Sequence, residues 1–311
     1  MQPEDSIAAE NLLSTYVGLN RMSDARAEMD RAGKLGLDTS TLDRTGRMQT
    51  YFLLGEPNEV QRIMTLVAGQ PDEFLATQAL AGIQLFSGEY RKASVTTQQA
   101  FEQAGLAKAP DVQANALLIN AASRGYAGLC EGNEQAVQKA LALDKSRQTQ
   151  SFAVFTAGTC GNAKLVGSMA QDLSKKYPDD TLIQRVFIPL AKAFVALSAG
   201  QPQEAIADAQ PAKSFNLIYP VAYVQGLAYL QLHDASQAAS AFRGAIQSPG
   251  GNLQTTAPFY AQAQLGLARA YAMGGDKANA KKAYEAFFTT WKDADTDLPM
   301  LAAAKKEYAA L

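Results

Sequence analysis

A short signature recurs eight times along this chain of 311 residues: Gly, Asn or His, then any four residues, then Ala or Val. It occurs at Asn20/Ala25, Gly55/Val60, Gly88/Ala93, Gly132/Val137, Gly161/Val166, Gly200/Ala205, His233/Ala238 and Gly275/Ala280. The first members are separated by roughly 30 to 44 residues, a quasi-period that is typical of stacked helical hairpins. We therefore predict an all-α chain of about eight helix pairs without a sheet.

Each signature lies between two helical stretches. Gly, Asn or His suits a helix end in the left-handed conformation, and the small residue lets the second helix pass close to the first. The expected hairpins cover residues 8–35, 43–70, 73–105, 111–146, 148–178, 181–213, 219–249 and 257–291, within one domain over 1–311. A capping helix over 298–311 follows, with Asp297 as its N-cap and Pro299 in its first turn.

Charge and hydropathy exclude two classes of partner. Charged residues make up 19% of the chain, the net charge is −2, and no block of like charge stands out, so we expect no nucleic-acid partner. The longest apolar stretch, Phe187 to Ala199, is interrupted by Lys192, so no membrane segment is expected. Met1 to Glu10 is acidic and polar and is not a signal peptide.

The best-formed unit shows the packing expected of such a hairpin. Gly226 and Ala238 would allow the two backbones to approach, while Tyr229 and Phe242 would fill the space between them. This spacing resembles the tetratricopeptide-repeat pattern, which implies a right-handed α-solenoid with a protein or peptide ligand and no cofactor.

The C-terminal third carries a closer resemblance, in segments 263–276 and 280–288 and in Trp291-Lys-Asp-Ala-Asp295. Together with Ser174-Lys-Lys-Tyr-Pro-Asp-Asp-Thr181 and Tyr219-Pro-Val-Ala-Tyr223, it resembles the repeat region of membrane-anchored bacterial serine/threonine kinases of acidobacterial type, and of related winged-helix regulators. The resemblance implies a sensory or scaffolding region on the periplasmic side of a membrane; a cytoplasmic location is the alternative. Kinase phosphate-loop and catalytic-loop motifs are absent from the sequence, so we expect no enzyme activity.

Two rival functions stay open. One is a stand-alone scaffold in cell-envelope assembly. The other is an all-α toroidal glycosidase, which would need two carboxylates facing each other across a cavity, and the predicted inner faces carry almost none.

Metal or acid–base chemistry has little support. His233 occupies the helix-ending position of its unit, where a terminal cap is expected. Asp293, Asp295 and Asp297 alternate as in a calcium loop, but the residues that should complete such a loop are Leu298 and Ala304. We expect a solvated turn there and no metal site.

The two cysteines, Cys130 and Cys160, are placed at the ends of the first helices of units four and five. Adjacent helices of stacked hairpins can bring Cα atoms within disulfide reach, so a disulfide and two buried free thiols are both open.

An aromatic series is the candidate binding site. The residues six positions before successive signatures are Tyr126, Phe155, Phe194, Leu227 and Arg269, and Phe187 and Tyr223 extend the row on the same helices. In tetratricopeptide arrays this position tends to face the concave side, so Tyr126, Phe155, Phe187, Phe194 and Tyr223 could form an apolar ladder ending at Arg269. Ordinary core packing is the alternative. The asparagine and lysine clamp of chaperone-tail-binding repeats is absent here, which disfavours capture of an acidic tail on this face.

Overall fold

The computed structural model describes residues 5–37, 41–215, 220–247, 249–253 and 258–311, and these residues contain helices and no strand. The helices pair in chain order. The pairs are α1 (Ser6–Gly18) with α2 (Met22–Lys34), α3 (Thr41–Leu53) with α4 (Pro57–Val67), α5 (Glu73–Phe86) with α6 (Tyr90–Leu106), α7 (Pro110–Tyr126) with α8 (Asn133–Leu143), α9 (Arg147–Thr159) with α10 (Ala163–Lys176), α11 (Ile188–Ser198) with α12 (Pro202–Ala209), α13 (Val221–Gln231) with α14 (Ala235–Ala245), and α16 (Tyr260–Met273) with α17 (Lys277–Thr290). The prediction of an all-α solenoid of helical hairpins is confirmed.

Four shorter or terminal elements complete the chain. A π-helix, η1 (Ile183–Phe187), leads into α11, and a 3₁₀ helix, η2 (Gln210–Phe215), follows α12. The short helix α15 (Pro249–Leu253) precedes the last hairpin, and α18 (Pro299–Ala309) packs on α17 as a terminal cap. The expected first residues of units seven and eight, 219 and 257, lie outside the described residues, as does Tyr219 of the family resemblance.

The eightfold signature has the predicted conformation throughout. All eight first members have positive φ angles, from 57° at Asn20 and His233 to 79° at Gly88 and Gly132. The eight small residues that follow them are all buried. The signature therefore marks the turn of each hairpin and the small residue packed after it.

Glycines set the close approaches between neighbouring helices. A Cβ on Gly158 of α9 would lie 2.6 Å from the Ala191 Cα of α11. The expected role of Gly226 needs correction: a Cβ there would lie 2.7 Å from the ring of Phe242, and one on Gly266 would lie 2.3 Å from the same ring. The two glycines thus leave room for a buried phenyl ring between α13 and α16.

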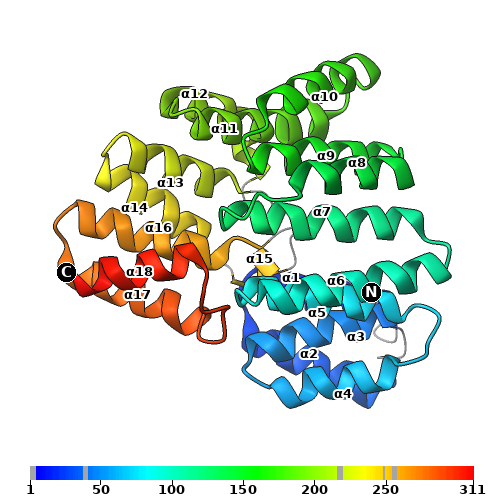
Figure 1. Ribbon diagram of the computed structural model, residues 1–311. Coiled ribbons are helices and arrows are strands. Elements are labelled where there is room, and N and C mark those ends of the chain that lie inside the picture. Colours follow the sequence, from blue (N-terminus) through cyan, green and yellow to red (C-terminus); the bar gives the residue numbers. More distant parts are fainter. Residues whose placement is uncertain (1–4, 38–40, 216–219, 248, 254–257) are drawn as a thin grey trace.

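The stack curves back on itself, so that its last third contacts its first third (Figure 1). From α1 the hairpins follow an arc through α7, α9 and α11 and return through α13 and α16, and α15 contacts α1, α3 and α5 near the centre. A Cβ on Gly250 of α15 would lie 2.4 Å from the Val17 carbonyl oxygen of α1. Leu253 is buried with Met48 and other apolar residues of the first hairpins. The concave face is therefore filled by the chain itself.

A contact that we call the clasp closes this arc, between the α5–α6 turn and the α17–α18 link. Trp291 Nε1 donates to the Phe86 carbonyl at 3.2 Å, and the Asp295 backbone N–H donates to the Gly88 carbonyl at 3.1 Å. Asp295 also accepts from the Arg91 backbone N–H at 2.9 Å. The link from Asp293 to Asp297 is a turn, as predicted, and Asp293 and Asp297 are exposed. Its middle is not fully solvated, because Ala294 is buried and Asp295 contacts this distant part of the chain.

The expected N-cap of the last helix is wrong. Leu298 occupies the N-cap position of α18 without a side-chain cap. The Asp297 carboxylate instead accepts two hydrogen bonds from the Arg91 guanidinium, at 2.8 and 3.0 Å. A bidentate partner on α6 competes better for this carboxylate than two backbone N–H groups do.

Candidate functional site

The predicted aromatic ladder is buried core. Tyr126, Phe155, Phe194 and Tyr223 are each at most 6% exposed. The Tyr126 ring lies 5.6 Å from Phe194 and 5.7 Å from Tyr223, and Phe259 covers it from the returning end of the chain at 5.8 Å. The four side chains do share one side of the stack, but curvature gathers them into a single cluster. The interpretation as an exposed ladder is therefore wrong, and core packing is the correct alternative.

Tyrosine hydroxyls in this core stay protonated. Burial raises the pKa of Tyr126 well above its ordinary value, and the same cause raises the pKa of Tyr223 and of Tyr90. The Tyr90 hydroxyl accepts a hydrogen bond from Gln262 Nε2 at 2.9 Å. These groups pack in the interior as neutral phenols and offer no acid–base chemistry at ordinary pH.

The two remaining members of the predicted site also have structural roles. Phe187 is half-buried in η1 and packs against the main core. Arg269 forms a bidentate pair with Glu307 of α18, both hydrogen bonds 2.9 Å long, and the Tyr284 hydroxyl donates to the same carboxylate at 2.8 Å. Arg269 therefore holds the terminal helix in place and does not end a ligand groove.

A disulfide joins Cys130 to Cys160, with their Cα atoms 5.6 Å apart. The expected position of Cys130 is corrected: α7 ends at Tyr126, so Cys130 lies in the link to α8, while Cys160 directly follows α9. The last turn of α7 also touches α9, since a Cβ on Gly125 would lie 2.3 Å from Thr159 Oγ1. The bond and this close approach fix the α7–α8 link against the next hairpin.

The held link forms one wall of a surface groove. The groove has a volume of about 210 Å³ and lies between α6, α7 and the start of α8. Its lining residues are Ser94, Thr97, Gln98, Leu117, Asn120, Ala121, Arg124, Leu129, Glu131, Gly132, Asn133 and Ala136. Its volume far exceeds the roughly 10 Å³ of the concavity between α1, α2 and α3 that is described below.

The polar groups of this groove are unequally paired. Asn120 Nδ2 donates to Thr97 Oγ1 at 3.2 Å, and buried Asn133 donates through Nδ2 to the Thr156 carbonyl at 3.1 Å. The half-buried Arg124 side chain makes neither an ion pair nor a hydrogen bond with any described residue. The groove therefore contains one guanidinium with all its donors available.

Sequence reasoning missed these residues because the signature selects other positions. Leu117, Asn120 and Arg124 follow one another at spacings of three and four residues, so they share one face of α7. The signal that could have found them is the pair of polar side chains, Asn120 and Arg124, four residues apart on the first helix of their unit.

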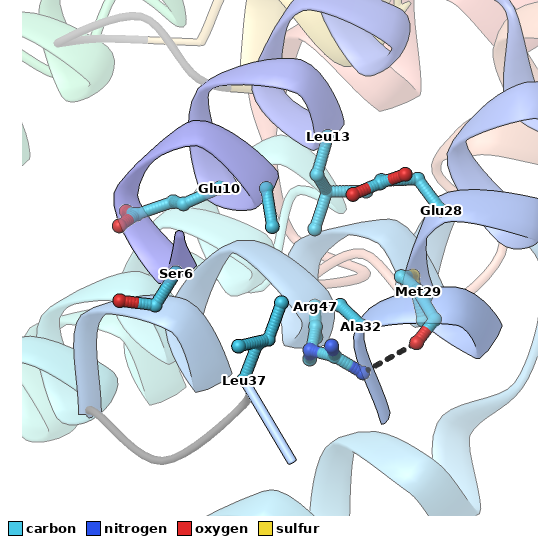
Figure 2. Close-up of a pocket in the computed structure, with 9 residues that line it drawn as sticks. Ser6, Glu10, Leu13, Glu28, Met29, Ala32, Leu37 and Arg47 are labelled. Atoms are coloured by element: carbon cyan, nitrogen blue, oxygen red, sulfur yellow. Dashed lines mark hydrogen bonds between the residues drawn. The ribbon is translucent and has the colours of Figure 1, made fainter. Parts of the chain in front are cut away.

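A second concavity, between α1, α2 and α3, is too small for a ligand (Figure 2). Its volume is about 10 Å³, which is room for one water molecule. Buried Glu28 pairs with Arg31 at 2.6 Å, and Arg47 donates to the Met29 carbonyl at 3.1 Å. These contacts give the buried charges partners and indicate a structural role.

Neither metal ligation nor a membrane span is found in the parts of the chain that the structure describes. No group of three His, Cys, Asp or Glu side chains there is arranged to hold an ion, and His233 is exposed in its left-handed turn. None of the described helices combines the length and the apolar character needed to cross a bilayer.

Comparison with known proteins identifies no family. No protein-family model matches the chain, and no curated protein matches it. Among solved structures, the TPR domain of P58(IPK) is similar at 12% sequence identity and a TM-score of 0.30, over 98% of each chain. At that score the likeness carries no inference about residues or ligands. The fold described above rests on the chain's own helix pairing.

Proposed function

We propose that this chain is a non-catalytic repeat domain that binds a protein or peptide. The observation that carries the proposal is the groove beside Arg124, an open concavity with unused hydrogen-bonding capacity on a scaffold held rigid by a disulfide. Rigid walls reduce the entropy lost when a flexible peptide is ordered on them. Because the chain itself fills the concave face, the groove beside Arg124 is the candidate site for a ligand.

The test is direct binding of short peptides to the intact, oxidised chain. A displayed library of random seven-residue peptides is panned on the protein, and enriched sequences are resynthesised with a fluorescent label for anisotropy titration. Saturable binding with micromolar to millimolar dissociation constants is the expected result. A library from which no sequence binds measurably contradicts a peptide-binding function.

We further propose that the domain is the sensory or scaffolding region of a receptor-like serine/threonine kinase and lies outside the cytoplasm. Two observations support this: the resemblance of the segments around Trp291, and the disulfide, a bond that persists in oxidising compartments. The reading frame upstream of Met1 is then expected to encode a transmembrane helix preceded by kinase motifs. A frame without them refutes the kinase association and favours the stand-alone envelope scaffold.

The isolated chain is expected to transfer no phosphate. Incubation with labelled nucleotide and a generic protein substrate should give no incorporation above that of a boiled control. Incorporation that persists through successive purification steps would contradict the non-catalytic assignment.

A further inference from the structure

We infer that the groove between α6, α7 and α8 recognises a single carboxylate within an extended peptide, and that Arg124 is the residue that binds it. This inference rests on the proposed function and specifies the ligand's chemistry. The carboxylate would be an Asp or Glu side chain with neutral or basic neighbours.

The first reason is the state of Arg124. Seven other arginines of the described chain, including Arg91 and Arg269, pair with a carboxylate at 2.6 to 2.9 Å through their shortest contact. Arg124 lines the groove without such a partner and is half-buried. A guanidinium presents parallel N–H groups that match the two oxygens of a carboxylate, which favours this anion over a neutral group.

The second reason is the rigidity of the turn that carries Arg124. The next residue, Gly125, has no space for a side chain because Thr159 and Cys160 lie against it. The Arg124 carbonyl accepts backbone hydrogen bonds from Ala127 and Leu129, which closes the end of α7. Because the neighbouring backbone is held from both sides, the Cα atom of Arg124 has a fixed position before a ligand arrives.

The third reason is the arrangement of the other polar groups. Asn120 lies one helical turn before Arg124 and donates its Nδ2 to Thr97, and no described residue donates to its side-chain oxygen. That oxygen suits the backbone N–H of an extended peptide whose carboxylate pairs with Arg124. The groove volume of about 210 Å³ lies below the roughly 300–1,000 Å³ of pockets for drug-sized ligands, which favours a single side chain with its neighbouring peptide group as the occupant.

Glu131 limits how much negative charge the groove accepts. Its exposed carboxylate lies on the wall formed by the disulfide-held link and pairs with no described cation. The Glu131 carboxylate would repel a second acidic residue on the peptide, whereas it would not repel a basic or neutral neighbour. The groove therefore selects one carboxylate and rejects acidic runs.

The experiment uses labelled peptides from the library above, together with variants of the intact, oxidised chain. Enriched peptides should share one Asp or Glu, and replacing it by Asn or Gln should raise the dissociation constant about tenfold or more, because a charge-assisted pair is lost. Arg124→Gln should give a similar loss, and Arg124→Lys should retain part of the affinity. Glu131→Gln should tighten binding of peptides with two acids more than of those with one.

Arg185→Ala is the matched control, since Arg185 is exposed on η1, outside the groove, and has no described partner. It should leave every dissociation constant unchanged. Equal far-ultraviolet circular dichroism and unfolding midpoints for all variants establish that affinity changes are local. Peptides that bind equally well to the Arg124→Gln variant overturn the carboxylate inference while leaving peptide binding intact. A complete lack of peptide binding overturns both.

Discussion

The clasp makes a quantitative prediction about Gly88. Gly88 and Gly275 have nearly the same backbone conformation, with φ angles of 79° and 76°, but different surroundings. A Cβ on Gly88 would lie 2.7 Å from the Ala294 Cβ and 2.9 Å from two atoms of the Trp291 ring. A Cβ on Gly275 would meet nothing within 4 Å. The effects of an alanine substitution on stability at the two sites should therefore differ mainly because of the clasp contact.

The expected magnitudes follow from this difference. Alanine in a left-handed turn costs about 1–2 kcal/mol of steric strain, which both variants share. Gly88→Ala adds overpacking against Trp291 and Ala294, which costs about 1–3 kcal/mol more. We therefore expect Gly88→Ala to lower the free energy of unfolding by about 1–3 kcal/mol more than Gly275→Ala does.

Urea unfolding followed by circular dichroism measures both losses under one set of conditions. Repeating the pair in a Trp291→Ala background completes a double-mutant cycle, because removing the indole should relieve much of the extra cost at Gly88. Equal losses at Gly88 and Gly275 would refute the close contact at the clasp. So would an excess at Gly88 that the Trp291→Ala background leaves unchanged.

Three further outcomes are expected. Phe155→Ala should cost about 3–5 kcal/mol in the same assay, as for a buried phenyl ring, and a loss below 1 kcal/mol would place this ring outside the core. Reduction of the Cys130–Cys160 bond, which spans a sequence separation of 30, should cost about 3–4 kcal/mol in the chain-entropy model, and an unchanged urea midpoint would contradict the bond. Backbone N–H donors at helix starts lower the pKa of Asp180 and of Asp276 below the ordinary 3.8. A depressed pKa in the folded state gives stability that is present above the unfolded value and lost as pH falls through the folded one. The thermal unfolding midpoint should therefore decrease as the pH is lowered below about 4. The Asp276→Asn variant should show a smaller decrease.

Local features of the fold were readable from sequence because their causes are local. A left-handed turn needs a residue such as Gly88 or His233, and the close packing after it needs a small residue such as Ala93 or Ala238. Each requirement acts within one hairpin, so the repeated signature located all eight turns. The Cys130–Cys160 pairing was one of two open alternatives, since it depends only on adjacent hairpins and their relative phase.

Exposure of the aromatic series depended on contacts that no local pattern encodes. Tyr126 and Phe155 lie on the inner side of their helices, as their spacing from the signature suggested, but a small change in curvature per repeat decides whether that side is open. Here the curvature brings Trp291 to Phe86 and Gln262 to Tyr90, pairs separated by 205 and 172 residues. Those contacts close the arc and bury the series.

The sequence by itself determined the repeat, its turns and the all-helical class, because helix propensity and turn chemistry act between residues close in the chain. Only the tertiary structure decided which surface remains for a ligand. Closure of the arc removed the concave face from solvent. It left the groove at Arg124, whose three walls come from α6, α7 and the disulfide-held link before α8. Whether a side chain is available to a ligand depends on which distant residues pack beside it, and those neighbours are set by the tertiary structure.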